Sequence, residues 1–174
     1  MRILLHVLFL SAAWKWGDWR NWRQYYPTML YMIVGDLMYN FLTYNYTMWK
    51  FNPTSFDKGI YSSHTLITLG IDFINFPAVV LLYLTHFPAK GLHKQILYIL
   101  VWAMMNSLIE LIAHFFSGIS YEHGWNYGWF AVFNVIMYIL LRTHYKQPLL
   151  ALGLSAILIV SYCFYFKLPL NTMK

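Results

Sequence analysis

The sequence predicts an all-α fold: a polytopic transmembrane helical bundle with about five membrane-spanning helices and a short N-terminal membrane or re-entrant helix. Two observations support this prediction. The 174 residues are 60% hydrophobic and only 10% charged, against roughly 25% charged in a soluble domain. Long apolar stretches also follow one another along the chain, each near the roughly 20 residues that cross a bilayer. Residues 1–174 therefore form a single transmembrane domain with no room for a soluble catalytic domain.

The N-terminal region divides into two parts. Residues 1–14 are a short N-terminal membrane segment that mimics a secretory signal peptide, and we expect it to stay as a barely spanning or re-entrant helix. Residues 15–27 form an interfacial element rich in Trp and Arg, because such residues concentrate where a bilayer meets water. The alternative for this element is an aromatic cage or a headgroup site. The expected anchors are Trp14, Trp16, Trp19, Trp22, Arg20 and Arg23.

Five stronger apolar segments follow, and breakers separate them. Pro27, Pro88, Gly124 and Pro148 lie between segments. A further proline, Pro77, lies inside the second segment and should kink its helix near Phe73. The last segment has no charged residue, so we expect it to pack on the outside of the bundle through its small residues. The predicted membrane-spanning ranges are 28–49, 65–87, 95–117, 125–141 and 148–166.

The basic residues predict an orientation. By the positive-inside rule, the side with more Lys and Arg in its short loops is cytoplasmic. That side carries Lys15, Arg20, Arg23, Lys90, Lys94, Arg142 and Lys146, and the other carries Lys50, Lys58, Lys167 and Lys174. Because the net charge of +6 is scattered over helix ends, the expected partner is the lipid bilayer with its anionic headgroups, and nucleic acid is not expected.

Polar residues within the apolar segments are the most informative feature. A carboxylate at a helix centre costs roughly 2.5 to 3.5 kcal/mol on insertion scales, so each must face protein or water. Their helical spacing places them on stripes that point to a common interior, and several lie roughly 10 to 13 Å below the outer end of their helix. These ligand- or ion-binding candidates are Asp36, Asn40, Asp72, Asn75, Asn106, Glu110, His114 and Asn134.

Three interpretations of this polar cluster remain open. The groups satisfy one another as interhelical hydrogen bonds, worth about 0.6 kcal/mol each. Alternatively, the carboxylates need a cation, a shared proton or a basic partner, since no Lys or Arg is expected at their depth. A weaker hypothesis is a metal site from His64, His114, His123 and Glu110, with Asp72 as a further donor. The isolated His6, His86, His93 and His144 are interpreted as interfacial residues.

Other motifs of catalysis are missing from the sequence. We find no nucleophile elbow, Walker motif or dinucleotide fingerprint, and no cofactor is identified. The single cysteine, Cys163, excludes an intramolecular disulfide. The many aromatic residues are typical of interfacial belts and core packing, and the alternative is a pocket for an apolar, ring-bearing or prenyl-like ligand.

Three runs carry a family resemblance: AAWKWGDWRNW, YYPTMLYMIVGDLMYNFLTYNY and LLRTHYKQPLL. Through them the chain resembles a family of small, uncharacterised polytopic membrane proteins from spore-forming, Bacillus-type bacteria. The resemblance extends along most of the chain. It implies a multi-pass protein of a bacterial cytoplasmic membrane, and it implies no activity, substrate or catalytic residue.

The function predicted from the sequence is binding or transport. An outward-facing polar cavity within the membrane would hold a small ligand, a cation or a proton. The first alternative is a membrane-embedded enzyme acting on a lipid or isoprenoid, with Glu110 or Asp72 as general acid or base and His114 as partner. The second is an accessory or assembly subunit of a larger membrane complex, and a homo-oligomer is also compatible with the sequence.

Overall fold

The computed structural model describes residues 2–54 and 59–169. Within these residues the chain forms six helices. They are α1 (Arg2–Trp16), α2 (Trp22–Leu42), a continuous helix of α3 (His64–Gly70), a π turn (Ile71–Asn75) and α4 (Phe76–Thr85), then α5 (Leu92–Phe115), α6 (Tyr127–Lys146) and α7 (Pro148–Tyr165). The predicted helical bundle is therefore confirmed, and the predicted number of helices matches, counting the N-terminal one.

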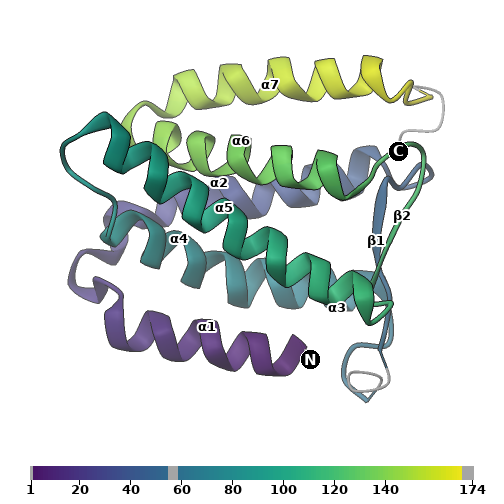
Figure 1. Ribbon diagram of the computed structural model, residues 1–174, viewed down its shortest axis with the longest axis horizontal. Coiled ribbons are helices and arrows are strands. Elements are labelled where there is room, and N and C mark those ends of the chain that lie inside the picture. The colour runs from purple at the N-terminus through teal and green to yellow at the C-terminus, as the bar shows by residue number, and fades with distance from the viewer. Residues whose placement is uncertain (1, 55–58, 170–174) are drawn as a thin grey trace.

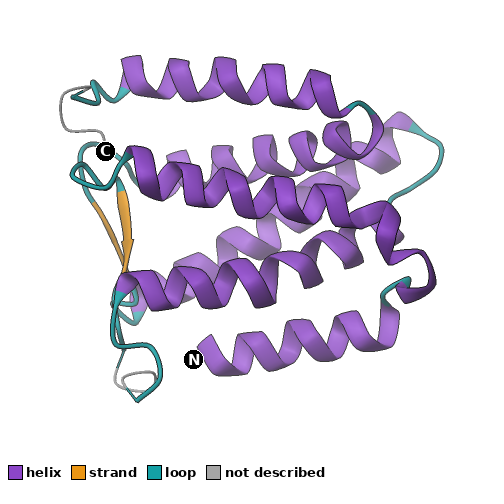
Figure 2. Cartoon of the chain, turned by 180° about the vertical axis from the view of Figure 1, so that it is seen from behind, coloured by secondary structure: helices purple, strands orange, loops and turns teal. Residues whose placement is uncertain are grey.

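The helices lie side by side along one direction, with connections at both ends of the bundle (Figure 1 and Figure 2). Helix α4 packs against α1 and α2, while α6 packs against α2, α5 and α7. All side chains of α4 from Ala78 to Leu84 are buried. At the core, the Tyr83 hydroxyl donates to the backbone oxygen of Tyr138 over 2.9 Å. The central position of α4 and α6 explains why both contribute to one continuous core.

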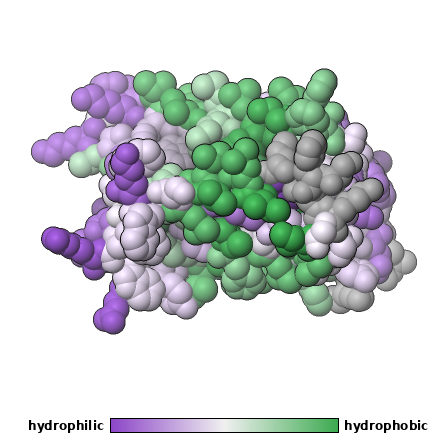
Figure 3. Space-filling view, turned by 90° about the horizontal axis from the view of Figure 1, so that it is seen from below, coloured by the Kyte–Doolittle hydropathy of each residue, from purple (hydrophilic) through white to green (hydrophobic). Residues whose placement is uncertain are grey.

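Within residues 2–54 and 59–169, three helices are long and apolar enough to cross a membrane: His64–Thr85, Leu92–Phe115 and Pro148–Tyr165. On the face seen in Figure 3, apolar side chains gather over the middle of the molecule and polar side chains lie toward its ends. An apolar surface of this extent is typical of membrane contact. Helices α2 and α6 are less apolar because they carry polar residues such as Asp36 and Asn134. As expected, α7 lies on the outside, and Ala151 is its buried residue.

The N-terminal segment is a regular helix and not a re-entrant loop. Helix α1 has 15 residues, which span roughly 22 Å at 1.5 Å per residue, less than the roughly 30 Å of a hydrocarbon core. It packs along α4 and the π turn. Its first residue, Arg2, donates hydrogen bonds to the backbone oxygens of Asn52 and Gly118 over 2.9 and 2.8 Å. The N-terminus is thus fixed at the end that holds the only strands of the described chain.

A turn over residues 43–48, followed by the start of a strand, replaces the last part of the helix predicted over 28–49. Helix α2 ends at Leu42, seven residues before the predicted boundary at Trp49, and β1 (Trp49–Phe51) follows. The strand pairs with β2 (Ile119–Tyr121) in antiparallel register, with Trp49 opposite Tyr121. The hydroxyl of Tyr39 explains the early end, because it accepts hydrogen bonds from the N–H groups of Met48 and Trp49. We call this pair of strands the ribbon.

Proline positions explain two further boundaries. The sequence predicts that Pro27 precedes its helix, but α2 begins at Trp22 and includes Pro27. A proline this near a helix start removes only one intrahelical hydrogen bond, so the helix tolerates it. The disturbance expected from Pro77 near Phe73 appears as the π turn, in which the Phe76 N–H bonds to the Ile71 oxygen. Helix α6 continues five residues beyond Leu141, to Lys146, and ends before Pro148.

The connections with the predicted excess of Lys and Arg, α1–α2, α4–α5 and α6–α7, share the end opposite the ribbon (Figure 1). Of the basic residues assigned to the other side, Lys58 and Lys174 lie outside the described residues. Trp14, Trp16, Trp19 and Trp22 are all exposed, as an interfacial anchor requires. Between them, Asp18 accepts a hydrogen bond from the Asn21 amide over 2.9 Å, and this bond lowers the pKa of Asp18.

Candidate functional site

A cavity of about 170 Å³ lies between α1, α2, the π turn, α5 and α6. We call it the polar cavity. Five of the predicted site residues line it: Asp36, Asn75, Asn106, Glu110 and Asn134. Asn134 is buried and its amide donates to the Ser107 hydroxyl over 3.3 Å. The helical stripes read from the sequence therefore do converge, as predicted.

Two carboxyl groups, of Asp36 and Asp72, lie next to each other between α2 and the π turn. We call them the acid pair. Asp72 is 0% exposed, and apart from the neighbouring Asp36 carboxyl its oxygens have no hydrogen-bond partner among the described residues. The hydroxyl of Thr68, one turn earlier on the same helix, is also buried and has no partner in the described part of the chain. Buried oxygens without partners are costly, so this location is suited to a proton or a cation that would satisfy them.

A chain of hydrogen bonds connects the acid pair to the ribbon. The Phe51 N–H donates to His64 Nδ1 over 3.1 Å, which leaves the ring proton of a neutral His64 on Nε2. That nitrogen lies 3.0 Å from Asn40 Oδ1, and the Asn40 amide donates to Asp36 Oδ2 over 2.8 Å. Every donor in the chain points toward Asp36. Asn40, a predicted site residue, thus acts as the link.

The second acid of the polar cavity, Glu110, has a different partner. It is buried on α5 and accepts a hydrogen bond of 2.7 Å from the hydroxyl of Tyr121 on β2. Burial raises the pKa of Tyr121, and the bond to Glu110 raises it further, so the phenol remains a donor. The ribbon therefore contacts both acidic locations, through His64 on one side and Tyr121 on the other.

The polar residues Arg2 and His6 of α1 also line the polar cavity. The sequence did not identify them as site residues. His6 is buried, with Nδ1 2.6 Å from Asn75 Oδ1, so its interpretation as interfacial is wrong. His144 is likewise buried, 3.0 Å from the Thr28 hydroxyl. Arg2, whose side of the membrane the sequence left undecided, lines the cavity as well. Arg2 and His6 were missed for one reason: the sequence left open whether α1 spans the membrane.

Arg2 provides a test of how the cavity is closed at the ribbon end. Its guanidinium bonds two backbone oxygens of the loops next to β1 and β2, and hydrogen bonds from charged groups are worth about 1.5–3 kcal/mol. We expect Arg2→Gln to increase hydrogen exchange of the ribbon amides by about tenfold or more. Exchange of the α4 core amides serves as the internal control. An unchanged ribbon would contradict this closing role.

The candidates for a metal site do not come together. Among the described residues, no group of three or more His, Cys, Asp or Glu is placed to hold a metal ion. His114 is exposed, outside the polar cavity, with Nδ1 3.0 Å from the Ile119 oxygen. His123 is exposed with Nδ1 2.9 Å from the Thr47 oxygen, while His64 and Glu110 have the partners given above. The predicted pairing of Glu110 with His114 is replaced by Glu110 with Tyr121.

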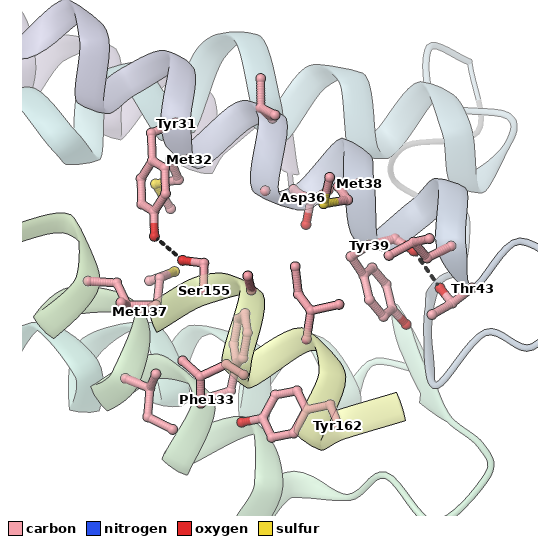
Figure 4. A pocket seen from close by; sticks show the side chains of 18 of the residues that line it. Tyr31, Met32, Asp36, Met38, Tyr39, Thr43, Phe133, Met137, Ser155 and Tyr162 are labelled. Atoms are coloured by element: carbon pink, nitrogen blue, oxygen red, sulfur yellow. Dashed lines mark hydrogen bonds between the residues drawn. The ribbon is translucent and has the colours of Figure 1, made fainter. Parts of the chain in front are cut away.

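A second, larger cavity of about 360 Å³ lies between α2, α6 and α7. We call it the lateral cavity. Its lining is mainly aliphatic and aromatic, and Asp36 is the one Asp, Glu, Lys, Arg or His among the lining residues in the described chain. Figure 4 shows the Asp36 carboxyl facing the space between α2 and α7, with Tyr31 bonded to Ser155 across it. Asp36 lines both cavities and so lies at their junction.

Comparisons with known proteins add no family assignment, since no family model, curated protein or solved structure matches the chain.

Proposed function

We propose that the chain is a multi-pass protein of a bacterial cytoplasmic membrane that binds, and carries across, a small cation or a proton at the acid pair. The observation that carries the proposal is the contact between Asp36 and Asp72, where Asp72 is fully buried and no N–H or O–H group of the described residues donates to its carboxyl oxygens. Two carboxyl groups that touch each other away from water do not both carry a charge by themselves. Either they share one proton, or a cation binds to both. An acidic residue inside a membrane bundle is energetically costly, and such residues usually mark a functional site.

The arrangement in the membrane is part of the proposal. We propose that all five long helices cross the bilayer, that α1 is a sixth, shorter membrane helix, and that the end with the basic connections is cytoplasmic. The ribbon, and with it the end of the polar cavity lined by Arg2, then faces outward. The resemblance to small membrane proteins of Bacillus-type bacteria supports the same location.

The test is ion flux in proteoliposomes that contain the purified protein. A pH-sensitive dye inside the vesicles reports protons, and radioactive sodium reports a metal cation. We expect wild-type protein to dissipate a proton or a sodium gradient faster than empty vesicles. The double variant Asp72→Asn with Glu110→Gln should lose this flux, because both buried acids then lack a charge.

The matched control is Asp18→Asn, which removes a carboxylate from the exposed α1–α2 connection and should leave the flux at the wild-type level. Size-exclusion chromatography shows whether each variant is folded. The proposal fails if the folded double variant keeps wild-type flux, or if wild-type protein moves neither ion.

The structure weakens the general acid or base mechanism predicted for a lipid-modifying enzyme, because His114 lies outside the polar cavity and Glu110 is paired with Tyr121. The third function, an accessory subunit, predicts that the chain co-purifies with a larger partner and moves no ion alone. The flux measurement therefore separates the accessory subunit from the cation-binding protein.

A further inference from the structure

The lateral cavity has the location of a site that is entered from the bilayer. It lies between α2 and α7, and on the outer surface of α2 its lining residues Val34 and Met38 are exposed. Gly35 also lines the cavity, and a Cβ atom at this position would meet no atom within 4 Å. A volume of about 360 Å³ falls within the roughly 300–1,000 Å³ of known ligand pockets. An apolar chain from the membrane therefore finds open space here.

The polar groups of the cavity limit which chain fits. Asp36 lies six residues before the end of α2 at Leu42, roughly 9 Å along the helix axis, so a ligand group that contacts it must sit within the bilayer. The headgroup of a phospholipid stays at the bilayer surface and does not reach this depth. A fatty acid would place its own carboxylate against Asp36 and be repelled. A cationic group, by contrast, would pair with it.

We infer that the lateral cavity binds a single-chain cationic amphiphile, with its aliphatic chain between α2 and α7 and its amine against Asp36. The Tyr162 hydroxyl on α7 also lines the cavity, and it is buried with no hydrogen-bond partner in the described part of the chain. Its oxygen is a second group that accepts a hydrogen bond from an ammonium. The recognition of the amine rests on the proposed cation binding at the acid pair, whereas the position of the chain depends on the lateral cavity alone. The inference therefore names an organic ammonium as a ligand class for this protein.

The experiment uses photocrosslinking in nanodiscs with full-length protein. The probe is dodecylamine that carries a diazirine on its chain, and the comparison probe is dodecanol with the same diazirine. We expect the amine probe to label peptides of α2 and α7 about tenfold more than the alcohol probe, as one charge-assisted hydrogen bond allows. Equal labelling by both probes would overturn the inference, and this result requires no variant.

Two glycines provide a matched pair of variants. Gly35→Phe would place a ring inside the lateral cavity, whereas Gly153→Phe adds the same ring on α7, where a Cβ also meets no atom but the residue does not line the cavity. We expect Gly35→Phe to reduce amine labelling about tenfold and Gly153→Phe to leave it unchanged. Equal labelling of the two variants would mean that the probe merely sits in bulk lipid, and would overturn the site.

Asp36→Asn distinguishes failure of this inference from failure of the proposed function. If the lateral cavity recognises the amine through Asp36, this variant removes the preference for amine over alcohol while both probes still label α2 and α7. A retained preference would overturn the assignment of Asp36. Ion flux is measured separately, on wild-type protein and on the double variant Asp72→Asn with Glu110→Gln. A lateral cavity that binds amine in a protein without flux would therefore leave this inference intact and reject the transport proposal.

Discussion

Replacement of Asp72 by alanine is expected to raise the thermal stability of the protein and to abolish its cation binding. The carboxyl group is fully buried, and no N–H or O–H group of the described residues donates to its oxygens, a situation that costs about 1–3 kcal/mol. Alanine removes this cost and favours the helix. The void of one carboxyl group costs less, about 0.5–1 kcal/mol by the cavity coefficient.

Thermal unfolding in detergent, together with sodium binding and proton uptake, measures both effects. In a chain of this size each kcal/mol shifts the midpoint by about 2–4 °C, so a rise of several degrees is expected. Asp18→Asn is the matched comparison, because the Asp18 carboxyl already has a hydrogen-bond partner in Asn21 and its removal should not raise stability. A lower midpoint for Asp72→Ala would show that Asp72 is satisfied in the folded protein and has a structural role.

A substitution that raises stability and abolishes binding indicates that the replaced group serves function at a cost to the fold. The π turn is consistent with such a site, because it carries both Asp72 and Asn75 and because Pro77 has no N–H for the Phe73 oxygen. Single π turns inside α-helices are frequent at functional sites. The sequence predicts the disturbance from Pro77, but not that the wider turn places Asp72 beside Asp36.

The convergence of the polar residues was predictable because it depends on helical periodicity alone. Asp36, Asn75, Glu110 and Asn134 each face inward in a stripe, and any bundle that shields them from lipid brings them together. Which residues form pairs depends on helix rotation and on loop structure. Tyr121 shows this, because a three-residue strand in a connection places its hydroxyl on Glu110, and such a strand has no distinct pattern in the sequence.

The contribution of α1 was not predictable from its composition. The segment has the length and apolar character of a signal peptide, and Arg2 reads as a flanking charge. Its position beside α4 depends on contacts such as that of His6 with Asn75 and that of Arg2 with the ribbon loops. These contacts join residues that are far apart in the sequence, so no local pattern records them.

Replacement of Tyr39 by phenylalanine is expected to destabilise the ribbon end of the bundle. The hydroxyl accepts hydrogen bonds from two backbone N–H groups, of Met48 and Trp49, over 3.1 and 3.0 Å. Phenylalanine keeps the ring that stacks on Trp49 with centroids 3.5 Å apart. Only the hydroxyl is lost, which also donates to the Trp49 backbone oxygen over 3.5 Å. Both donors belong to buried residues, and each unpaired buried group costs about 1–3 kcal/mol.

Thermal unfolding and hydrogen exchange of the ribbon amides measure this loss, and Tyr165→Phe is the matched control because Tyr165 lies exposed on α7. We expect Tyr39→Phe to lower the midpoint by several degrees and to increase exchange at Met48 and Trp49 first. If the two variants behave alike, water or another group replaces the lost acceptor and the early end of α2 has a different cause. If only Tyr39→Phe opens the ribbon, this hydroxyl connects the end of α2 to β1. Because β1 also begins the chain of hydrogen bonds through His64 to Asp36, the variant should then change the rate at which ions reach the acid pair.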